Sequence, residues 1–234
     1  MGQKKLHRFE AIKSFPNVLE YPTDMKGKWN RFFNNDHLLN LELACGKGEY
    51  TLGLARLYPQ QNFIGIDIKG NRIYVGAKLS MEEKVNNTAF LRTQIQKLPE
   101  YFNPGEVSEI WITFPDPQLR TSRAKNRLTH PRFLRLYQQV IKPGGYIHLK
   151  TDSTALYHFT RYVANMYKIP IVEDIADVIA QPNISKELKI TTHYEKLDIE
   201  KSNKIYYLKF TIPALLPDID HQLYEELKRI ETLI

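Results

Sequence analysis

The sequence has little cysteine and no long apolar segment, and each absence limits what the protein can be. Cys45 is the single cysteine among 234 residues, so the chain can form no internal disulfide and offers no cysteine cluster for a structural zinc ion. No stretch approaches the ~20 apolar residues of a membrane-spanning helix. The first 30 residues also lack the apolar centre of a secretory signal. We therefore expect a cytoplasmic protein without a membrane partner.

Metal-binding patterns are missing as well. The histidines that could be considered as ligands lie too far apart or in the wrong register for a zinc or iron motif. These are His130, His148, His158 and His193. We expect no metal, and we read His148 as a packing or surface residue of a strand.

Positive charge, by contrast, is abundant. The formal net charge is +7 and the isoelectric point is near 9.3, while 42% of the residues are hydrophobic. Such a chain can bury a full core, and its basic balance favours a polyanionic partner, either a nucleic acid or a membrane surface. The positive charge could also reflect a surface that is simply rich in lysine. The positions of the basic residues along the chain have to decide between these two explanations.

Short apolar runs alternate with helical patterns along most of the chain. This alternation predicts an α/β fold with a doubly wound, mostly parallel, seven-stranded sheet and helices on both faces. The seven expected strands cover 38–43, 62–68, 88–91, 107–114, 146–150, 171–179 and 205–212. The expected helices cover 49–57, 71–84, 131–142, 153–166 and 218–233.

The first part of the chain shows no sustained period. Residues 1–37 mix basic side chains with aromatic ones such as Phe9, Phe15 and Trp29. We predict a basic and aromatic arm with one short helix over 1–37, followed by a single domain over 38–234.

The turn after the first expected strand is the place to look for a ligand, because such folds bind ligands at the carboxyl ends of their strands. Gly46 and Gly48 provide a tight turn, but Thr51 stands where a dinucleotide fingerprint needs a third glycine. Asp67 ends the next strand, 21 residues after Gly46, where an acid can accept hydrogen bonds from the ribose hydroxyls of an adenosine. Alone, the glycines could form an ordinary turn, and Asp67 could cap a helix.

Glu42 is an ionisable residue inside an apolar strand, just before these glycines. A buried carboxylate is costly unless it is paired or hydrogen-bonded. A cofactor with a sulfonium and an amino group would provide cationic partners, whereas phosphates would be repelled. Glu42 therefore favours S-adenosylmethionine over a dinucleotide.

These segments resemble the bacterial tRNA (guanine-N7-)-methyltransferase family, within the class I S-adenosylmethionine-dependent methyltransferases, whose fold is Rossmann-like. The glycine turn is generic to the class, but a Phe-Pro-Asp-Pro motif followed by a basic loop is specific to the family. The resemblance covers about residues 38–212 and rests on segments 41–49, 63–67, 114–117, 127–129, 150–152 and 192–195.

The resemblance implies transfer of a methyl group to N7 of a guanine in tRNA, the guanosine at position 46 of the variable loop. It also implies roles for particular residues. The cofactor site would be lined by Glu42, Gly46, Gly48, Asp67, Gln94 and Asp116. The substrate guanosine would be faced by Asp116, Arg120, Asp152, Thr192, His193, Tyr194 and Glu195.

Three residues depart from the family pattern. Ala44 replaces a usual glycine, so the turn is bulkier. Gln94 replaces a usual acid, although its amide oxygen can still accept from an adenine amino group. Gln118 replaces a common tryptophan and removes one stacking or packing contact.

The segment after Asp116 carries four cations and no acid within eight residues. A basic run is often only a solvated face. Here the run follows a strand end at the expected active site, so we predict phosphate contacts that position tRNA without reading its sequence. The predicted contacts are Arg123, Lys125 and Arg127, with Arg120 nearer the guanosine.

Guanine N7 carries a lone pair, so no proton has to leave before a methyl group arrives. Catalysis then requires alignment and charge stabilisation. We predict that Asp116, held between two prolines, accepts hydrogen bonds from the N1–H and amino group of guanine. Two alternatives remain open: a class I methyltransferase for another substrate, and a non-catalytic RNA-binding relative, for which Ala44 and Gln94 are the best support. Monomer and homodimer are both compatible with the sequence.

Overall fold

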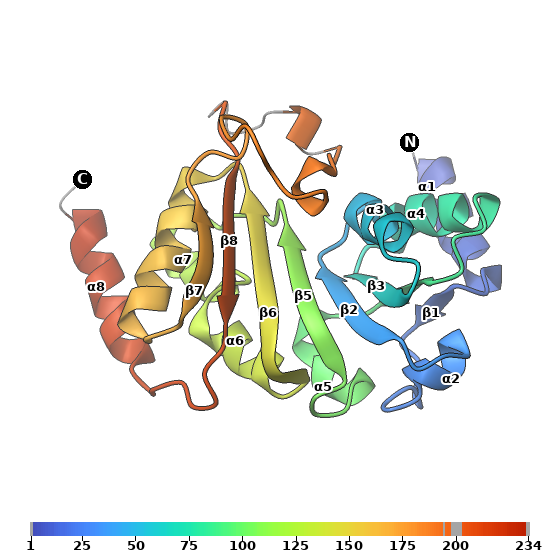
Figure 1. The fold of residues 1–234 in the computed structure, drawn as a ribbon, viewed down its shortest axis with the longest axis horizontal. Helices are drawn as coiled ribbons and strands as arrows, with labels where there is room; N and C mark the ends of the chain where they lie inside the picture. The colour runs from blue at the N-terminus through green and yellow to red at the C-terminus, as the bar shows by residue number, and fades with distance from the viewer. Residues whose placement is uncertain (1, 194, 198–202, 233–234) are drawn as a thin grey trace.

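A computed structural model describes residues 2–193, 195–197 and 203–232. Its centre is a twisted sheet of eight described strands in the order β1-β4-β3-β2-β5-β6-β8-β7 (Figure 1). The predicted α/β, doubly wound fold is confirmed. Strands β1 to β6 run parallel, and β8 and β7 are antiparallel to their neighbours. The strands are β1 Val18–Glu20, β2 Leu38–Leu43, β3 Gln61–Asp67, β4 Thr88–Arg92, β5 Val107–Thr113, β6 Ile141–Thr151, β7 Ile171–Ile175 and β8 Tyr206–Thr211.

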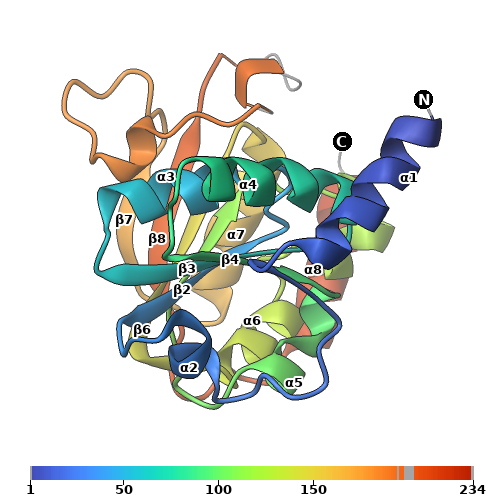
Figure 2. The ribbon, with the colours of Figure 1, turned by 90° about the vertical axis from the view of Figure 1, so that its right-hand side faces the viewer.

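Helices cover both faces of the sheet because its strands alternate their side chains between two cores. Leu41 and Leu43 of β2 enter the larger core, formed with α5, α6 and α7, whereas Trp111 of β5 packs on the opposite face, toward α3. Figure 2 shows α3 and α4 on one side of β3 and β4, with α5 and α6 on the other. The α-helices are α1 Gly2–Ala11, α2 Trp29–Phe33, α3 Glu49–Leu57, α4 Gly70–Glu82, α5 Leu98–Tyr101, α6 Pro131–Gln138, α7 Thr154–Met166 and α8 Asp220–Thr232.

The eighth strand comes from the amino-terminal segment, where the sequence predicted no strand. Val18 pairs with Phe90 and Glu20 with Arg92, and an ion pair between the Glu20 and Arg92 side chains supports the contact. Trp29 is buried and donates from its indole nitrogen to Tyr101 O at 2.9 Å. The predicted boundary at residue 37 therefore does not coincide with a break in packing, and a separate arm over 1–37 stays a prediction.

Strand β6 is longer than predicted, and helix α6 before it is shorter. The pairing of β5 with β6 shifts register between Val107, opposite Ile141, and Glu109, opposite Tyr146. This bulge accommodates Gly144, whose φ is +73°. The chain thus re-enters the sheet before the Pro-Gly-Gly turn, which the sequence placed between helix and strand.

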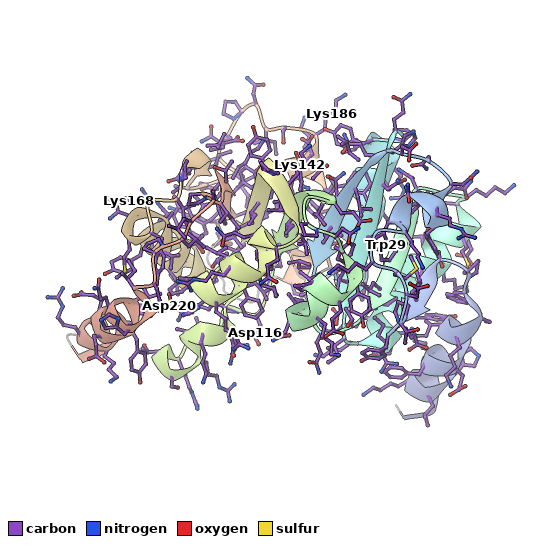
Figure 3. All side chains as sticks on the ribbon, turned by 90° about the horizontal axis from the view of Figure 1, so that it is seen from below. Trp29, Asp116, Lys142, Lys168, Lys186 and Asp220 are labelled. Atoms are coloured by element: carbon purple, nitrogen blue, oxygen red, sulfur yellow. The ribbon has the colours of Figure 1, made fainter. Side chains whose placement is uncertain are left out.

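Within the described residues, no helix is long and apolar enough to cross a membrane. The molecule is elongated along one axis. Asp220 at the start of α8 lies toward one end of that axis and Trp29 toward the other (Figure 3).

Candidate functional site

A cleft of about 480 Å³ lies at the carboxyl ends of β2, β3, β5 and β6. Its size is in the usual range for a site that binds a small molecule. Its walls are the turn after β2, the end of β3 with the start of α4, the segment 113–117 after β5, and Asp152 after β6. Thr192 contributes from a distant part of the chain.

The turn after β2 is tight because three residues adopt left-handed backbone conformations. The φ angles are +55° at Ala44, +57° at Gly46 and +68° at Gly48. A Cβ on Gly48 would lie 2.4 Å from Phe90 Cε1, so glycine is required there. Ala44 and Gly46 line the cleft, whereas Gly48 does not. The turn therefore presents backbone to a ligand, with strain at Ala44, where an L-residue is disfavoured.

Asp67 closes the same turn from β3. One carboxylate oxygen accepts from Gly46 N at 2.9 Å and the other accepts from Lys69 N at 2.8 Å. The side chain is buried yet lines the cleft. Each carboxylate oxygen has a further lone pair, which suits it to accept from hydroxyl groups of a bound molecule.

Glu42 borders the cleft from inside the sheet and is 3% exposed. Its carboxylate accepts from Thr51 N at 2.7 Å, from the Thr51 hydroxyl at 2.5 Å and from the Thr113 hydroxyl at 2.8 Å. Burial nevertheless raises the pKa of Glu42 to about 7, with the threonine hydrogen bonds opposing the shift. The protein's own α3 and β5 therefore provide hydrogen-bond donors for the Glu42 carboxylate. The cationic partners expected from the sequence are not needed to explain its burial.

Asp116 lies on the rim of the cleft and is exposed. Its carboxylate accepts from Gln118 N at 3.0 Å. Phe114, with φ +46°, turns the chain out of β5, and Phe114 N donates to Lys150 O at 2.8 Å. The prolines at 115 and 117 flank Asp116, so its backbone is restrained on both sides.

The predicted substrate residues divide into two groups. Asp152 and Thr192 line the cleft. The His193 side chain is exposed, and His193 N donates to Glu49 Oε1 at 3.0 Å. Glu195 is instead held by Lys150 Nζ at 2.9 Å. Tyr194 lies outside the described residues.

Gln94 is exposed and lies outside the main cleft. It lines an adjoining cavity of about 320 Å³ that shares Ala44 and Asp67 with the cleft. Gln94 therefore lies in a separate cavity that borders the glycine turn at Ala44.

The basic loop after Asp116 presents some of its cations to solvent and buries one. Arg120, Arg123 and Lys125 are exposed, the latter two on a short 3-10 helix, Thr121–Asn126. Arg127 departs from the prediction. It is 6% exposed, and its guanidinium donates to the carbonyl oxygens of residues 117, 118 and 119 at 3.1 to 3.2 Å and lies over the Phe159 ring. Arg127 therefore stabilises the loop from inside, because its Nε and Nη2 donors bind backbone carbonyl oxygens of the loop.

Sequence reasoning missed Lys69 and Arg72, which line the cleft from the start of α4. Their closeness to Asp67 in sequence was a usable signal. It also missed Lys150, whose position in a strand gave no sign of its partners. Within the described part of the chain, no group of three or more potential ligands could hold a metal ion.

The chemistry of the cleft fits S-adenosylmethionine. Five carboxylate side chains line it, from Glu42, Glu49, Asp67, Asp116 and Asp152, against two cations, Lys69 and Arg72. Such a lining favours a ligand with a sulfonium and an ammonium group and disfavours the diphosphate of a dinucleotide. Gly46, with a φ of +57°, lines the cleft beside these charges.

The family that the sequence matches places this cleft in the class of S-adenosylmethionine-dependent methyltransferases. The sequence matches a family model described as "Putative methyltransferase" over residues 36–208. The 16S rRNA methyltransferase KamB shares the fold with a TM-score of 0.59 and 15% identity, over 81% of this chain and 93% of that one. A 30S ribosomal A1408 methyltransferase from an uncultured bacterium has a TM-score of 0.57 at 17% identity, over 82% of this chain and 95% of that one.

Closer relatives identify the family. The chain is 43% identical to the tRNA (guanine-N(7)-)-methyltransferase of Bacteroides thetaiotaomicron, over 95% of this chain and 93% of the relative. It is 46% identical to the protein of that name from Christiangramia forsetii, over 91% of this chain and 100% of the relative. The chain belongs to the tRNA (guanine-N(7)-)-methyltransferase family, which confirms the resemblance noted in the sequence.

Proposed function

We propose that this protein transfers the methyl group of S-adenosylmethionine to N7 of a guanine in tRNA, at position 46. The observation that carries the proposal is that two surfaces of opposite charge lie next to each other. A cleft with five carboxylates and two cations in its lining suits a cationic cofactor, and the exposed cations of the 120–125 loop begin four residues after Asp116 on its rim. A polyanion and a cationic methyl donor can therefore meet at one strand end.

The cofactor would be held by backbone and carboxylates. The proposed cofactor residues are Glu42, Gly46, Gly48, Asp67, Gln94 and Asp116. Asp67 would accept from ribose hydroxyls, while Gly46 gives close backbone approach and Gly48 allows the turn itself. Glu42 would act indirectly by holding the glycine turn in place, since its hydrogen bonds fix the start of α3 to β2 and β5. When bound, S-adenosylmethionine supplies an electrophilic methyl group on sulfur.

The chain's own residues would bind and orient the guanine. As N7 gains a methyl group, the ring gains positive charge, and the Asp116 carboxylate would accept from N1–H and the amino group more strongly than in the ground state. No proton has to leave N7, so no general base is required. Asp152, Thr192, His193, Tyr194 and Glu195 are the further proposed residues of the guanosine side.

The tRNA backbone would lie along the exposed cations of the loop, which position it without reading sequence. Arg120, Arg123 and Lys125 are the proposed contacts there. We propose that the protein acts in the cytoplasm, as a monomer or a homodimer.

The position of methylation can be tested with two unmodified tRNA transcripts that differ only at position 46, one with guanine and one with adenine. Methyl-labelled cofactor should label the first transcript and not the second. Equal labelling of both would contradict the assignment of position 46. Cofactor binding without transfer to any RNA would favour another substrate, and the absence of both would favour a non-catalytic RNA-binding protein.

A further inference from the structure

Lys150 is a buried lysine near the end of β6, and the proposed chemistry assigns it no role. Its side chain is 0% exposed. The ammonium nitrogen lies 5.5 Å from the ring centre of Tyr50 and 5.6 Å from that of Phe114. Burial lowers the pKa of Lys150, and the Glu195 carboxylate opposes the shift. A charge in this position needs a structural reason, because burying it is costly.

The reason lies in a segment about 40 residues further along the chain. Lys150 Nζ donates to Leu188 O at 3.1 Å, to Ile190 O at 2.9 Å and to Glu195 Oε2 at 2.9 Å. An ammonium group has three donors, so these three acceptors use all of them. All three belong to the described residues of the segment 188–195, which lie outside the strands of the sheet.

This segment carries Thr192 into the cleft wall. Thr192 is 4% exposed, and its hydroxyl accepts from Glu195 N at 3.1 Å. The acceptors of Lys150 at Ile190 and Glu195 therefore bracket Thr192 on both sides. Glu195, in turn, is occupied by Lys150 and does not line the cleft.

We propose that Lys150 is a positioning residue that fixes Thr192 against the guanine side of the cleft. Glu195 acts as the counter-ion of Lys150 in this anchor. The inference rests on the proposed function for its consequence in catalysis. The anchoring itself does not depend on it. The cofactor side of the cleft, at Gly46 and Asp67, makes none of these contacts and should be unaffected.

The test compares the full-length protein with Lys150→Met, which keeps the length of the side chain and removes its donors. Lys142→Met is the matched control, because Lys142 lies at the other end of the same strand and is not placed at the cleft. Three quantities are measured: amide hydrogen exchange of segment 188–195, S-adenosylmethionine affinity by calorimetry, and kcat/KM for tRNA methylation. Lys150→Met should speed exchange in that segment and lower kcat/KM by about 10-fold to 100-fold, as expected for a displaced contact. Cofactor affinity should change less than about 3-fold, and Lys142→Met should change none of the three.

Glu195→Gln provides a second variant in case Lys150→Met does not fold. It keeps a carbonyl oxygen for Lys150 and removes the charge, so exchange in 188–195 should rise in the same direction by a smaller factor. Unchanged exchange in a folded Lys150→Met protein would overturn the proposal, as would faster exchange with unchanged kcat/KM. Unchanged exchange in both folded variants would show that the ion pair does not hold the segment and would also overturn it. A wild-type protein that methylates no tRNA would instead refute the proposed function, while the exchange data would still decide whether Lys150 anchors the segment.

Discussion

The buried acid Glu42 connects the stability of the core with the cleft. Its carboxylate receives hydrogen bonds from α3 and β5, so it fixes the helix that starts at the glycine turn. These contacts only partly offset the loss of hydration, and burial raises the pKa of Glu42 to about 7. The ordinary pKa of a glutamate is near 4.5. Between pH 4.5 and pH 7, the folded protein therefore binds a proton at Glu42 more tightly than the unfolded chain does.

Replacing Glu42 by Gln should remove that pH dependence. The contribution of a raised carboxyl pKa to stability is present at low pH and is lost as the pH rises toward 7. Urea unfolding without cofactor should show Glu42→Gln gaining roughly 2 kcal/mol relative to wild type between pH 5 and pH 7.5. Parallel pH profiles for the two proteins would contradict the assigned cause.

Asp116 is the side chain with the largest predicted effect on rate. Asp116→Asn keeps the shape but removes the charge and turns one acceptor into a donor that faces guanine donors. We expect the barrier of the single-turnover reaction to rise by about 2–4 kcal/mol, as for loss of a charge-stabilising group. Cofactor affinity, measured by calorimetry, should change much less. An Asn variant with wild-type rate would exclude Asp116 from the reaction.

At the residue scale, what the sequence predicted well was local. Gly46, Asp67 and Asp116 stand at strand ends, and the fold brings all strand ends to one edge, so their meeting in one cleft follows from topology. The position of Arg127 could not be predicted in this way. Its three carbonyl partners and Phe159 define it, and a basic run looks the same in sequence whether a member points outward or inward. The contact between Lys150 and Glu195 could not be predicted for the same reason, since it joins residues 45 positions apart.

At the scale of elements, the errors also have physical causes. Strand β1 has three residues, too few for an alternating pattern, and it is defined by its pairing with β4. Strand β6 begins before the Pro-Gly-Gly turn because a bulge against β5 accommodates that turn. Long strands with strong apolar patterns, such as β2 and β3, were predicted correctly because burial on both faces leaves a clear signal.

The basic loop is the element whose role can be tested by salt dependence. Replacing Arg123 and Lys125 by Gln removes two exposed cations. The slope of log affinity for tRNA against log salt should fall by about 1–2 units, while cofactor affinity stays the same. The matched control replaces Arg31 of α2 and Lys142 at the start of β6, neither of which lines the cleft, and should leave the slope as it is. An unaltered slope in the loop variant would show that the loop is only a solvated face.

At the scale of the whole molecule, charge is distributed unevenly. The chain carries a net charge of +7, yet the cleft is lined by five carboxylates and two cations. The positive balance therefore resides outside the cleft, where it can attract a polyanion without competing for a cationic cofactor. This division supports one assembly in which tRNA lies on the outside and reaches the cofactor through the cleft.

The chemical identity of the methylated nucleoside tests this account most directly. The full-length protein is incubated with S-adenosylmethionine and an unmodified tRNA transcript, and the RNA is digested and analysed by liquid chromatography and mass spectrometry. The account predicts 7-methylguanosine as the product, formed in proportion to enzyme and much more slowly by Asp116→Asn. A methyl group found instead on N1 or the amino group of guanine, or on another base, would contradict the account.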